Sequence, residues 1–421
     1  MNEASSSSGE IRFRVLESET RFVVDGVATS RATLIGVRPS RAYESLHWGD
    51  ATRWGQWFRS SDSQLAASFL WLLRRPGGML PLDELRRMIP GVQDPGEIVG
   101  LVIVTHEGLP EELLAAGAPA YSGWMITRAG AVPFPVHAEP AAFGAVQLRG
   151  GWPLQALQGD TVSIVGTGSI GSAAANALAR VGLGQIHLID PDRLLWHNVV
   201  RHHLGPESVG RFKVDALSDA LREHAAGADE STATVFDAHR LDAVTGAEDL
   251  YPLVEESSVV LCCADGIAPR RVVNHLARIT RTPAVFACVL DNGSIGELYR
   301  SRPGRRRGCL LCHRAWLAKN GWIDPEADQE LEYGTGTTHK PMSAIPADLQ
   351  LVGEFAAQAT LATLLEAKHG VPGSRLPGDH AVIGLRPTGD LAGPYNFDFA
   401  GEVRWTDAPV PREDCATCSI R

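Results

Sequence analysis

A glycine-rich turn placed directly after a short apolar run restricts the fold of this chain more than any other feature of its sequence. The run is Val162-Ser163-Ile164-Val165, and the turn that follows it reads Gly166-Thr167-Gly168-Ser169-Ile170-Gly171. This order is typical of a strand, a tight turn and a helix N-terminus whose backbone amides can approach a phosphate group. The pattern therefore predicts a nucleotide site at the end of a strand in an α/β sheet.

Around this turn, apolar stretches alternate with helical patterns along the chain. Such alternation is typical of an α/β domain in which helices join the strands of one sheet. We therefore predict a doubly wound parallel sheet within residues 158–421. Its expected strands are Val162–Val165, Ile186–Ile189, Val259–Cys262 and Ala284–Val289, its helices Ser172–Val181, Arg211–His224, Arg270–Ile279 and Asp348–Lys368, and its closing meander Ala381–Leu385, Tyr395–Phe399 and Glu402–Trp405.

The preceding residues predict a smaller α+β domain between residues 11 and 135. Partly alternating apolar residues around Asp25-Gly26 favour a hairpin, and helical periodicity follows further on. Helices followed by a small β-ribbon resemble a winged helix. Residues 1–10 are interpreted as a disordered tail, and residues 136–157, rich in Pro, Ala and Gly, as a linker. The expected helices are Ser63–Arg75, Leu82–Ile89 and a third with Asp94 as its cap and Pro95 in its first position, and the expected ribbon is Tyr121–Val132.

Four cysteines form two pairs that lie far apart in the sequence. Cys309 and Cys312 make the first C-x-x-C pair, and Cys415 and Cys418 make the second. Four thiolates fill a tetrahedral zinc site and leave no open position, as a structural Zn²⁺ site requires. A redox role is disfavoured, because neither pair is expected to begin a helix after a thioredoxin-like strand.

Charge and hydropathy exclude several classes of partner. The formal net charge of -10 argues against a broad electrostatic contact with nucleic acid. The chain has no apolar run of transmembrane length and no signal-peptide pattern at its N-terminus, so we expect a cytoplasmic protein without a membrane partner. Cysteines stay reduced in the cytoplasm, and Cys262, Cys263 and Cys288 are expected to be small core residues on strands.

Residues beyond the glycine turn help to separate the classes of nucleotide. Asp190 lies nineteen residues after Gly171, where a strand end can bind ribose hydroxyls, and this fits NAD as well as ATP. Asp190 is followed by Asp192, by Asn198-Val-Val-Arg201, by Gly210-Arg-Phe-Lys213, and by Cys263-Ala-Asp265 with Arg270 and Asn274. This order of elements resembles the ThiF/MoeB/ubiquitin-activating-enzyme superfamily over roughly residues 155–421.

The resemblance implies a Rossmann-like, ThiF-type fold and ATP-dependent adenylation of a C-terminal carboxylate. A carboxylate is already a competent nucleophile, so the reaction needs in-line positioning and cations rather than a strong base. Arg201, Lys213 and Asp265 are the candidate catalytic residues. By the same resemblance, Gly166, Gly168 and Gly171 would hold phosphate, Asp190 the ribose, Asn198, Arg201 and Lys213 the triphosphate, and Asp265 a Mg²⁺ ion.

The chain departs from the family pattern in three places. The family's Arg-Gln becomes Arg201-His202-His203, and we expect the two histidines to pack rather than bind phosphate. An arginine-rich segment usually precedes the glycine turn, and Arg149 is the nearest candidate here. Family members that form a thioester keep a cysteine in the crossover segment, whereas residues 321–345 contain none.

The superfamily offers two kinds of substrate, a Gly-Gly-tailed ubiquitin-like or sulfur-carrier protein and a ribosomal precursor peptide. Peptide-modifying members of the microcin C type resemble this chain in having an N-terminal peptide clamp and in lacking the loop cysteine. We therefore favour a precursor peptide, with leader binding by residues 11–130 or, alternatively, a purely structural or dimerising role for that domain. The resemblance also implies a homodimer.

Other interpretations stay open at this point. A nucleotide-sensing protein with a DNA-binding N-terminal domain and an NAD-dependent oxidoreductase both fit the glycine turn. The basic run at Arg300, Arg302, Arg305, Arg306 and Arg307 is interpreted as a solvated loop rather than a partner surface. The tryptophans at 54, 57, 71, 316 and 322 are expected in the core or at its rim.

Overall fold

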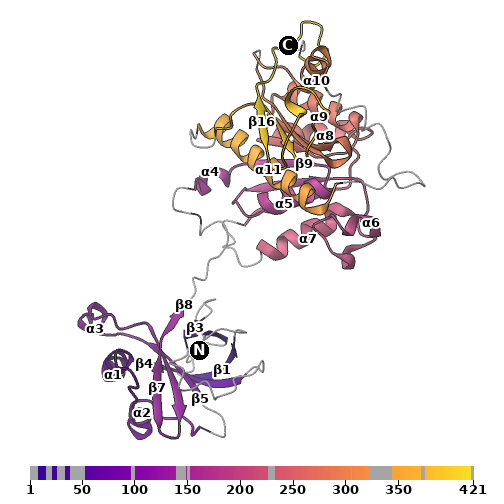
Figure 1. The fold of residues 1–421 in the computed structure, drawn as a ribbon. Helices are drawn as coiled ribbons and strands as arrows, with labels where there is room; N and C mark the ends of the chain where they lie inside the picture. Colours follow the sequence, from indigo (N-terminus) through magenta and orange to yellow (C-terminus); the bar gives the residue numbers. More distant parts are fainter. Residues whose placement is uncertain are drawn as a thin grey trace. The chain divides into compact units, whose positions relative to one another are not determined.

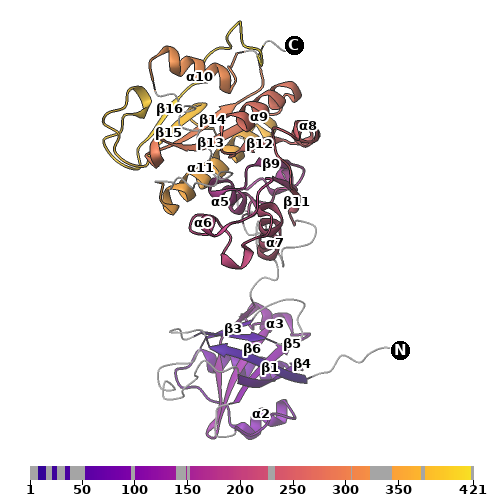
Figure 2. The ribbon, with the colours of Figure 1, turned by 90° about the vertical axis from the view of Figure 1, so that its right-hand side faces the viewer.

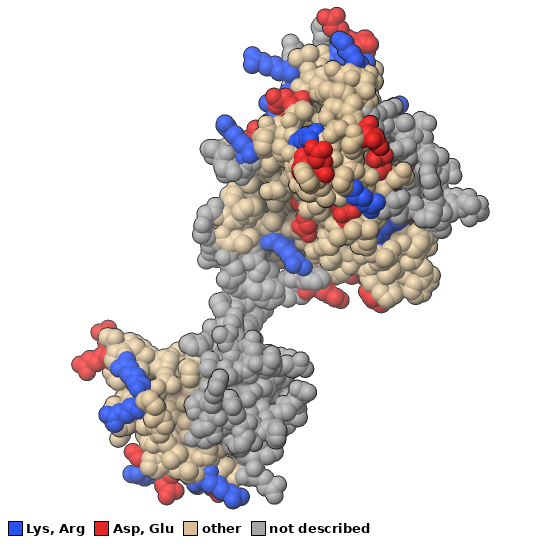
Figure 3. All heavy atoms as spheres, viewed as in Figure 1, with Lys and Arg blue, Asp and Glu red and all other residues tan. Residues whose placement is uncertain are grey.

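The computed structural model describes residues 8–15, 21–25, 34–37, 53–95, 100–138, 148, 152–225, 233–304, 306–322, 344–370 and 375–418. The chain divides into two compact units, Met1–Ala141 and Ala142–Arg421. Within the described residues no helix has the length and apolar character needed to cross a membrane. On the face that Figure 3 shows, Lys and Arg side chains are interspersed with Asp and Glu side chains on both units.

The first unit is built on an eight-stranded sheet in the order β7-β6-β5-β4-β1-β2-β3-β8 (Figure 1). Its neighbouring strands run antiparallel except β4 and β5, which are parallel. One apolar cluster joins α1 and α2 to the sheet, with Phe69 packed edge-on against Trp124 at 5.3 Å between ring centres. The elements are β1 Ser8–Val15, β2 Arg21–Asp25, β3 Leu34–Val37, β4 Arg53–Ser60, α1 Ser63–Leu73, α2 Leu82–Met88, β5 Gly100–His106, α3 Glu111–Ala115, β6 Tyr121–Thr127, β7 Gly130–Phe134 and β8 Val136–Ala138.

This unit confirms a small N-terminal α+β domain, with more sheet than the expected ribbon. The helices at Ser63 and Leu82 and the ribbon β6-β7 are present. The third expected helix would occupy residues 96–99, which lie outside the described residues, and β5, whose residues Leu101–Val104 are all buried, begins directly after them at Gly100. Valine and isoleucine in that run favour a strand.

Two expected boundaries also change. Ser8, Gly9 and Glu10 belong to β1 rather than to a disordered tail. Val136–Ala138 forms β8, which pairs with β3, and Leu154–Leu157 forms the short helix α4 of the second unit, so the segment expected as a linker is partly built into both units. The Gly26 of the expected hairpin turn lies outside the described residues.

The second unit confirms the doubly wound sheet, in the order β11-β10-β9-β12-β13-β14-β15-β16. The first five strands are parallel and the last three are antiparallel additions. Residues of α5, α7 and α11 pack on one face, and residues of α8 and α9 pack on the other (Figures 1 and 2). The elements after α4 are β9 Thr161–Val165, α5 Ser169–Leu178, β10 Gln185–Ile189, α6 Trp196–Val199, α7 Lys213–Ala225, β11 Val235–His239, α8 Ala247–Glu256, β12 Val259–Cys262, α9 Ile267–Thr280, β13 Ala284–Leu290, β14 Ile295–Ser301, α10 Leu310–Lys319, α11 Pro346–Leu364, β15 His380–Gly384 and β16 Val403–Thr406.

One expected strand is wrong and several elements were missed. Tyr395 ends a 3-10 turn that begins at Gly393, and Pro394 within that turn has no backbone N–H for a sheet. The sequence interpretation did not include β11, α8, β14 or α10. The order of the strands nevertheless places a reversal between β9 and β12, because the chain proceeds from β9 through β10 to β11 and then returns to the other side of β9. Ligands of open α/β sheets bind at such a reversal.

Candidate active site

A cavity opens at the carboxyl ends of β9, β12 and β13, beside the reversal in strand order. Each of these strands runs directly into residues that line it. About 1150 Å³ of empty space, open solvent at the mouth included, lies among the residues that line it. The lining includes Gly168, Ser169 and Ile170 after β9, Cys263, Ala264, Asp265 and Gly266 after β12, Ala287–Gly293 at the end of β13, and Asn198, Arg201, His202, Lys213 and Leu349.

The three glycines of the turn meet three different steric requirements. Gly166 has a φ of +87°, and a Cβ there would lie 2.5 Å from the backbone nitrogen of Ala264. A Cβ on Gly171 would lie 1.9 Å from the carbonyl oxygen of Gly166. Gly168 has open space around it and precedes the first turn of α5, which has no side-chain cap. The turn therefore leaves a helix N-terminus open to the cavity, where its amides and dipole favour an anion.

This difference predicts that replacement of Gly171 lowers stability, whereas replacement of Gly168 weakens nucleotide binding. Gly171→Ala should lower the free energy of unfolding by about 2–3 kcal/mol, because the new methyl overlaps backbone that cannot move aside. Gly168→Ala should leave the unfolding temperature unchanged but weaken nucleotide binding, because its methyl projects into free space at the helix N-terminus. Thermal unfolding and nucleotide titration of both variants check the pair. Equal stability of the two variants would contradict the assignment of Gly171 to packing.

Two cationic side chains line the cavity, and they differ in whether the protein already provides them with carboxylate partners. The Nζ of Lys213 lies 2.8 Å from the Asp192 carboxylate and 3.7 Å from Asp190. Burial opposes the charge of Lys213, but the carboxylates of Asp190 and Asp192 outweigh it and raise its pKa. Arg201 is half-buried, and among the described residues its guanidinium has no hydrogen bond or ion pair. The guanidinium of Arg201 therefore supplies a positive charge in the cavity that no carboxylate among the described residues pairs with.

Asn198 and His202 shape the segment that carries Arg201. The Asn198 Oδ1 accepts the Leu195 N–H at 2.9 Å, which closes the first turn of α6. The His202 Nε2 donates to the Thr167 carbonyl at 2.8 Å, and its Nδ1 accepts from the Leu204 N–H at 3.1 Å. Burial lowers the His202 pKa to about 4, so this ring is neutral at pH 7. His202 thus contacts the cavity but fastens one loop to the glycine turn, in agreement with the packing expected of it, whereas His203 is exposed, which corrects that expectation.

Asp190 lies under the glycine turn rather than in the lining of the cavity. Its carboxylate accepts the Thr167 N–H at 2.8 Å and the Asp192 N–H at 2.9 Å. Burial raises the pKa of Asp190, while Lys213 acts in the opposite direction. Through these contacts Asp190 fixes the conformation of the glycine turn and the position of the Lys213 side chain.

Asp265 stands at the end of β12, with its side chain accessible from the cavity. Desolvation by the surrounding protein raises the Asp265 pKa, and Lys213 and Arg201 oppose the rise. A carboxylate oxygen is a ligand that Mg²⁺ prefers, so this residue fits the ion that the family resemblance implied. Arg149, the other arginine considered for this site, lies outside the described residues.

The free cysteines of the sheet are buried, as expected. Cys262 is fully enclosed, and Cys263 and Cys288 each keep 7 % exposure at the cavity wall. Burial raises the pKa of all three thiols, to about 11 for Cys262. A thiol whose pKa is raised is a weak nucleophile at pH 7.

The two distant cysteine pairs meet in one cluster. The Sγ of Cys309 lies 3.6 Å from that of Cys415 and 4.0 Å from that of Cys312, and Cys312 lies 3.7 Å from Cys418. Four sulfurs bound to one zinc ion at ~2.3 Å stand about 3.8 Å apart, so the cluster fits Zn²⁺. Cys309 caps the helix α10, but that helix follows the antiparallel strand β14 and an intervening loop rather than a thioredoxin-like strand. The convergence of all four thiols still opposes a redox pair.

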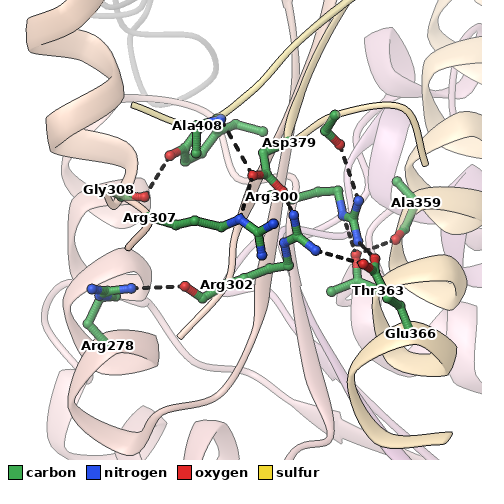
Figure 4. A network of polar contacts seen from close by, with 12 residues as sticks. Arg278, Arg300, Arg302, Arg307, Gly308, Ala359, Thr363, Glu366, Asp379 and Ala408 are labelled. Atoms are coloured by element: carbon green, nitrogen blue, oxygen red, sulfur yellow. Dashed lines mark hydrogen bonds and ion pairs between the residues drawn. The ribbon is translucent and has the colours of Figure 1, made fainter. Parts of the chain in front are cut away.

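Three arginines of the basic run, Arg300, Arg302 and Arg307, belong to an ion-pair network rather than to a solvated loop (Figure 4), whereas Arg306 is exposed as expected. Arg300 is 2 % exposed and pairs with Glu366 at 2.6 Å, and Arg302 contacts both Glu366 and Asp379. Arg307 also pairs with Asp379, at 3.1 Å. Arg278 links the network to the cysteine cluster, since it donates to the Arg302 carbonyl and lies 3.6 Å from the Cys418 Sγ. Arg305 lies outside the described residues.

A second group with metal-ligating side chains does not fit a divalent ion. Glu297, His313 and His380 are buried, and their ligand atoms lie within 4.8 Å of one another. Arg314 already binds both oxygens of Glu297, at 2.8 and 2.6 Å, and holds the Glu297 pKa well below its usual range although burial opposes this. A divalent ion here would face that guanidinium in a buried site, so the group is a polar network of the core.

The tryptophans vary in burial. Trp57 is buried and donates to the Thr105 hydroxyl, whereas Trp71 is 53 % exposed and so is not a core residue. Trp316 and Trp322 pack edge to face at 4.9 Å. The side chain of Trp54 lies outside the described residues.

Sequence reasoning missed one wall of the cavity, formed by the end of β13 and the turn Asp291–Gly293. The turn carries a signal that could have been noticed, because Asp-Asn-Gly is a strong hairpin sequence. Recognising it would have required β14 to be identified first.

Comparison with known proteins adds an independent observation. A model of the ThiF family matches residues 141–376. The sulfur carrier protein ThiS adenylyltransferase of Bacillus subtilis is 32% identical over 152 residues, which cover 35% of this chain and 42% of the relative. The molybdopterin-synthase adenylyltransferase of Escherichia coli is 31% identical over 141 residues, which cover 32% of this chain and 52% of the relative.

A ubiquitin-like modifier-activating enzyme 5 of Branchiostoma floridae is 25% identical over 217 residues, covering 49% of this chain and 50% of the relative. The chain thus spans about half the length of these curated relatives. Among solved structures, E. coli MccB with AMPCPP and MccA is 19% identical with a TM-score of 0.44, and covers 63% of this chain and 68% of that one.

Proposed function

We propose that this chain, which belongs to the ThiF family, is an ATP-dependent adenylyltransferase that transfers AMP to the C-terminal carboxylate of a ribosomal precursor peptide. The observation that carries the proposal is the convergence in one cavity of the open N-terminus of α5, the cations Arg201 and Lys213, and the carboxylate of Asp265. An anion-binding helix end, two cations and a carboxylate suit a triphosphate better than the two phosphates of NAD.

In the proposed reaction a carboxylate oxygen of the peptide attacks the α-phosphorus of ATP. A new P–O bond forms between the carboxylate oxygen and the α-phosphorus. The bond from the α-phosphorus to the oxygen that bridges it to the β-phosphorus breaks, and pyrophosphate leaves with that electron pair. The amides at Gly168–Ile170 would orient the phosphates, and Arg201 and Lys213 would stabilise negative charge on the leaving group. None of these steps requires a general base, because the nucleophile is ionised at pH 7.

Asp265 would hold Mg²⁺, which, when bound, neutralises charge on the phosphates. Asn198 would contribute its amide N–H groups to the triphosphate, since its oxygen is already used by Leu195. We assign the ribose to Asp190, whose carboxylate oxygens each accept one backbone bond and retain a second lone pair. The cysteine cluster, which does not line the cavity, would bind Zn²⁺ as a structural ion.

The choice of a peptide as substrate is supported by two features of this chain. The sheet of the first unit ends in the strand β8, and a leader peptide can be bound by addition of a strand to such an edge, whereas the other end strand, β7, already pairs with Leu80. Residues 321–345 contain no cysteine, which disfavours thioester transfer to a carrier protein. The alternative substrate is a Gly-Gly-tailed ubiquitin-like or sulfur-carrier protein. We expect the enzyme to act as a homodimer, which light scattering can check.

ATP–pyrophosphate exchange tests the proposal with the purified full-length protein. The candidates are precursor peptides and Gly-Gly-tailed proteins encoded beside the gene, each also prepared with a C-terminal amide in place of the carboxylate. We expect exchange with one free-acid peptide and none with its amide, because the amide removes the nucleophile. Exchange only with a Gly-Gly protein would establish the alternative substrate. Absence of exchange with every candidate, or equal exchange with the amides, would refute carboxylate adenylation.

A further inference from the structure

The turn between β13 and β14 has an unusual backbone where it lines the cavity. Asp291, Asn292 and Gly293 have φ angles of 48°, 50° and 89°, so three consecutive residues occupy the left-handed region. Asparagine and aspartate tolerate this region better than other L residues, but it still costs conformational free energy. Strained backbone of this kind is frequent where a functional group must be held in one place.

The surrounding structure fixes this turn on several sides. Leu290 pairs with Ile295 at the base of the hairpin, and Ser294 donates its N–H to the Asp291 carbonyl at 3.0 Å. A Cβ on Gly293 would lie 2.6 Å from the Cα of Ala344, so the turn is pressed against the residues that precede α11. Asp291 therefore has a defined position at the cavity wall.

The Asp291 carboxylate is not committed to any partner among the described residues. No hydrogen bond or ion pair to it occurs there, although it is half-buried and shares the cavity with Arg201 and Lys213. Neighbouring strands stand ~4.8 Å apart, so the ends of β9 and β13, separated by β12, lie about 10 Å from each other. The cavity thus has an anion-binding side at α5 and an acidic side with Asp265 after β12 and Asp291 after β13.

A substrate carboxylate would be repelled by the acidic side, whereas an N–H donor next to that carboxylate would be attracted to it. We propose that Asp291 is a specificity-determining residue that binds a side chain with N–H donors, an ammonium, guanidinium or amide, on the last residue of the substrate peptide. This inference rests on the proposed function and narrows its substrate class. A Gly-Gly tail offers no side chain for this contact.

A binding experiment tests the proposal on the full-length protein saturated with AMPCPP. Nα-acetyl-lysine, Nα-acetyl-asparagine, Nα-acetylglycine and Nα-acetylglutamate each carry one free carboxylate and serve as minimal probes of the last residue. We expect the lysine probe to bind about tenfold more tightly than the glycine probe, as one charge-assisted hydrogen bond implies. Asp291→Asn should reduce this preference to less than about threefold.

Asp291→Asn also removes the negative charge of the side chain while keeping the backbone conformation of the turn. Asparagine accepts the left-handed conformation at least as well as aspartate, so the hairpin and the affinity for AMPCPP should be unchanged. The proposal is overturned if the native protein does not distinguish the lysine and glycine probes, if the variant keeps the preference, or if no probe binds. Pyrophosphate exchange with a precursor peptide in any of these cases would show that the adenylation proposal stands while this inference fails.

Discussion

Asp265→Asn is expected to lower the rate of ATP–pyrophosphate exchange by about a thousandfold. Asparagine has the shape of aspartate but lacks the charge that would hold Mg²⁺ between the enzyme and the phosphates. The fold should not suffer. Asp265 is exposed at the cavity, and among the described residues its side chain makes no hydrogen bond or ion pair, so the neutral replacement removes no contact of the fold. The unfolding temperature of the variant should therefore equal that of the native protein.

Asp249→Asn is the matched control, since Asp249 is an exposed carboxylate in the first turn of α8 and does not line the cavity. Its exchange rate should stay within twofold of the native rate, as is usual for such surface changes. Exchange by the Asp265 variant within tenfold of the native rate would remove Asp265 from the metal role.

Cys415→Ser should remove zinc and stability together. The side chain of Cys415 is fully buried within the cluster, and a serine hydroxyl is a poor ligand for Zn²⁺ beside three thiolates. We expect the zinc content to fall from one ion per chain to near zero and the free energy of unfolding to fall by about 3 kcal/mol or more. Metal analysis and thermal unfolding of the same preparation measure both quantities.

Cys288→Ala provides the comparison for this variant, because Cys288 is a buried cysteine outside the cluster. It should keep the full zinc content. If the Cys415 variant also kept it, the assignment of the four thiols to one structural ion would be wrong.

Local sequence patterns predicted the elements nearest the glycine turn well. The apolar run of β9, the glycines and the alanine-rich helix α5 act within a few residues of each other, so their chemistry is visible in a short window. The same holds for the cysteine pairs, whose ligand type restricts what they can bind. The residues expected to bind ATP and Mg²⁺ remain predictions, which the variants above test.

Elsewhere the sequence interpretation failed because the contacts join residues that are far apart in the chain. Arg300 looks like part of a charged loop, but its partner Glu366 lies 66 residues further along the chain, and Asp379, the partner of Arg302, is more distant still. Asp291 was missed for a related reason, because its place at the cavity depends on β14 pairing with β13. Such contacts depend on the tertiary fold, and no local pattern reveals them.

The cysteine cluster has a consequence for the order of assembly. Cys309 and Cys415 are 106 residues apart, and the strands β15 and β16 lie between them. Bringing such distant residues together is entropically costly until the intervening strands have paired, so we expect β9 and α5 to form early and the four thiols to meet late. Tight zinc uptake by a newly made chain would then report that the second unit has finished folding.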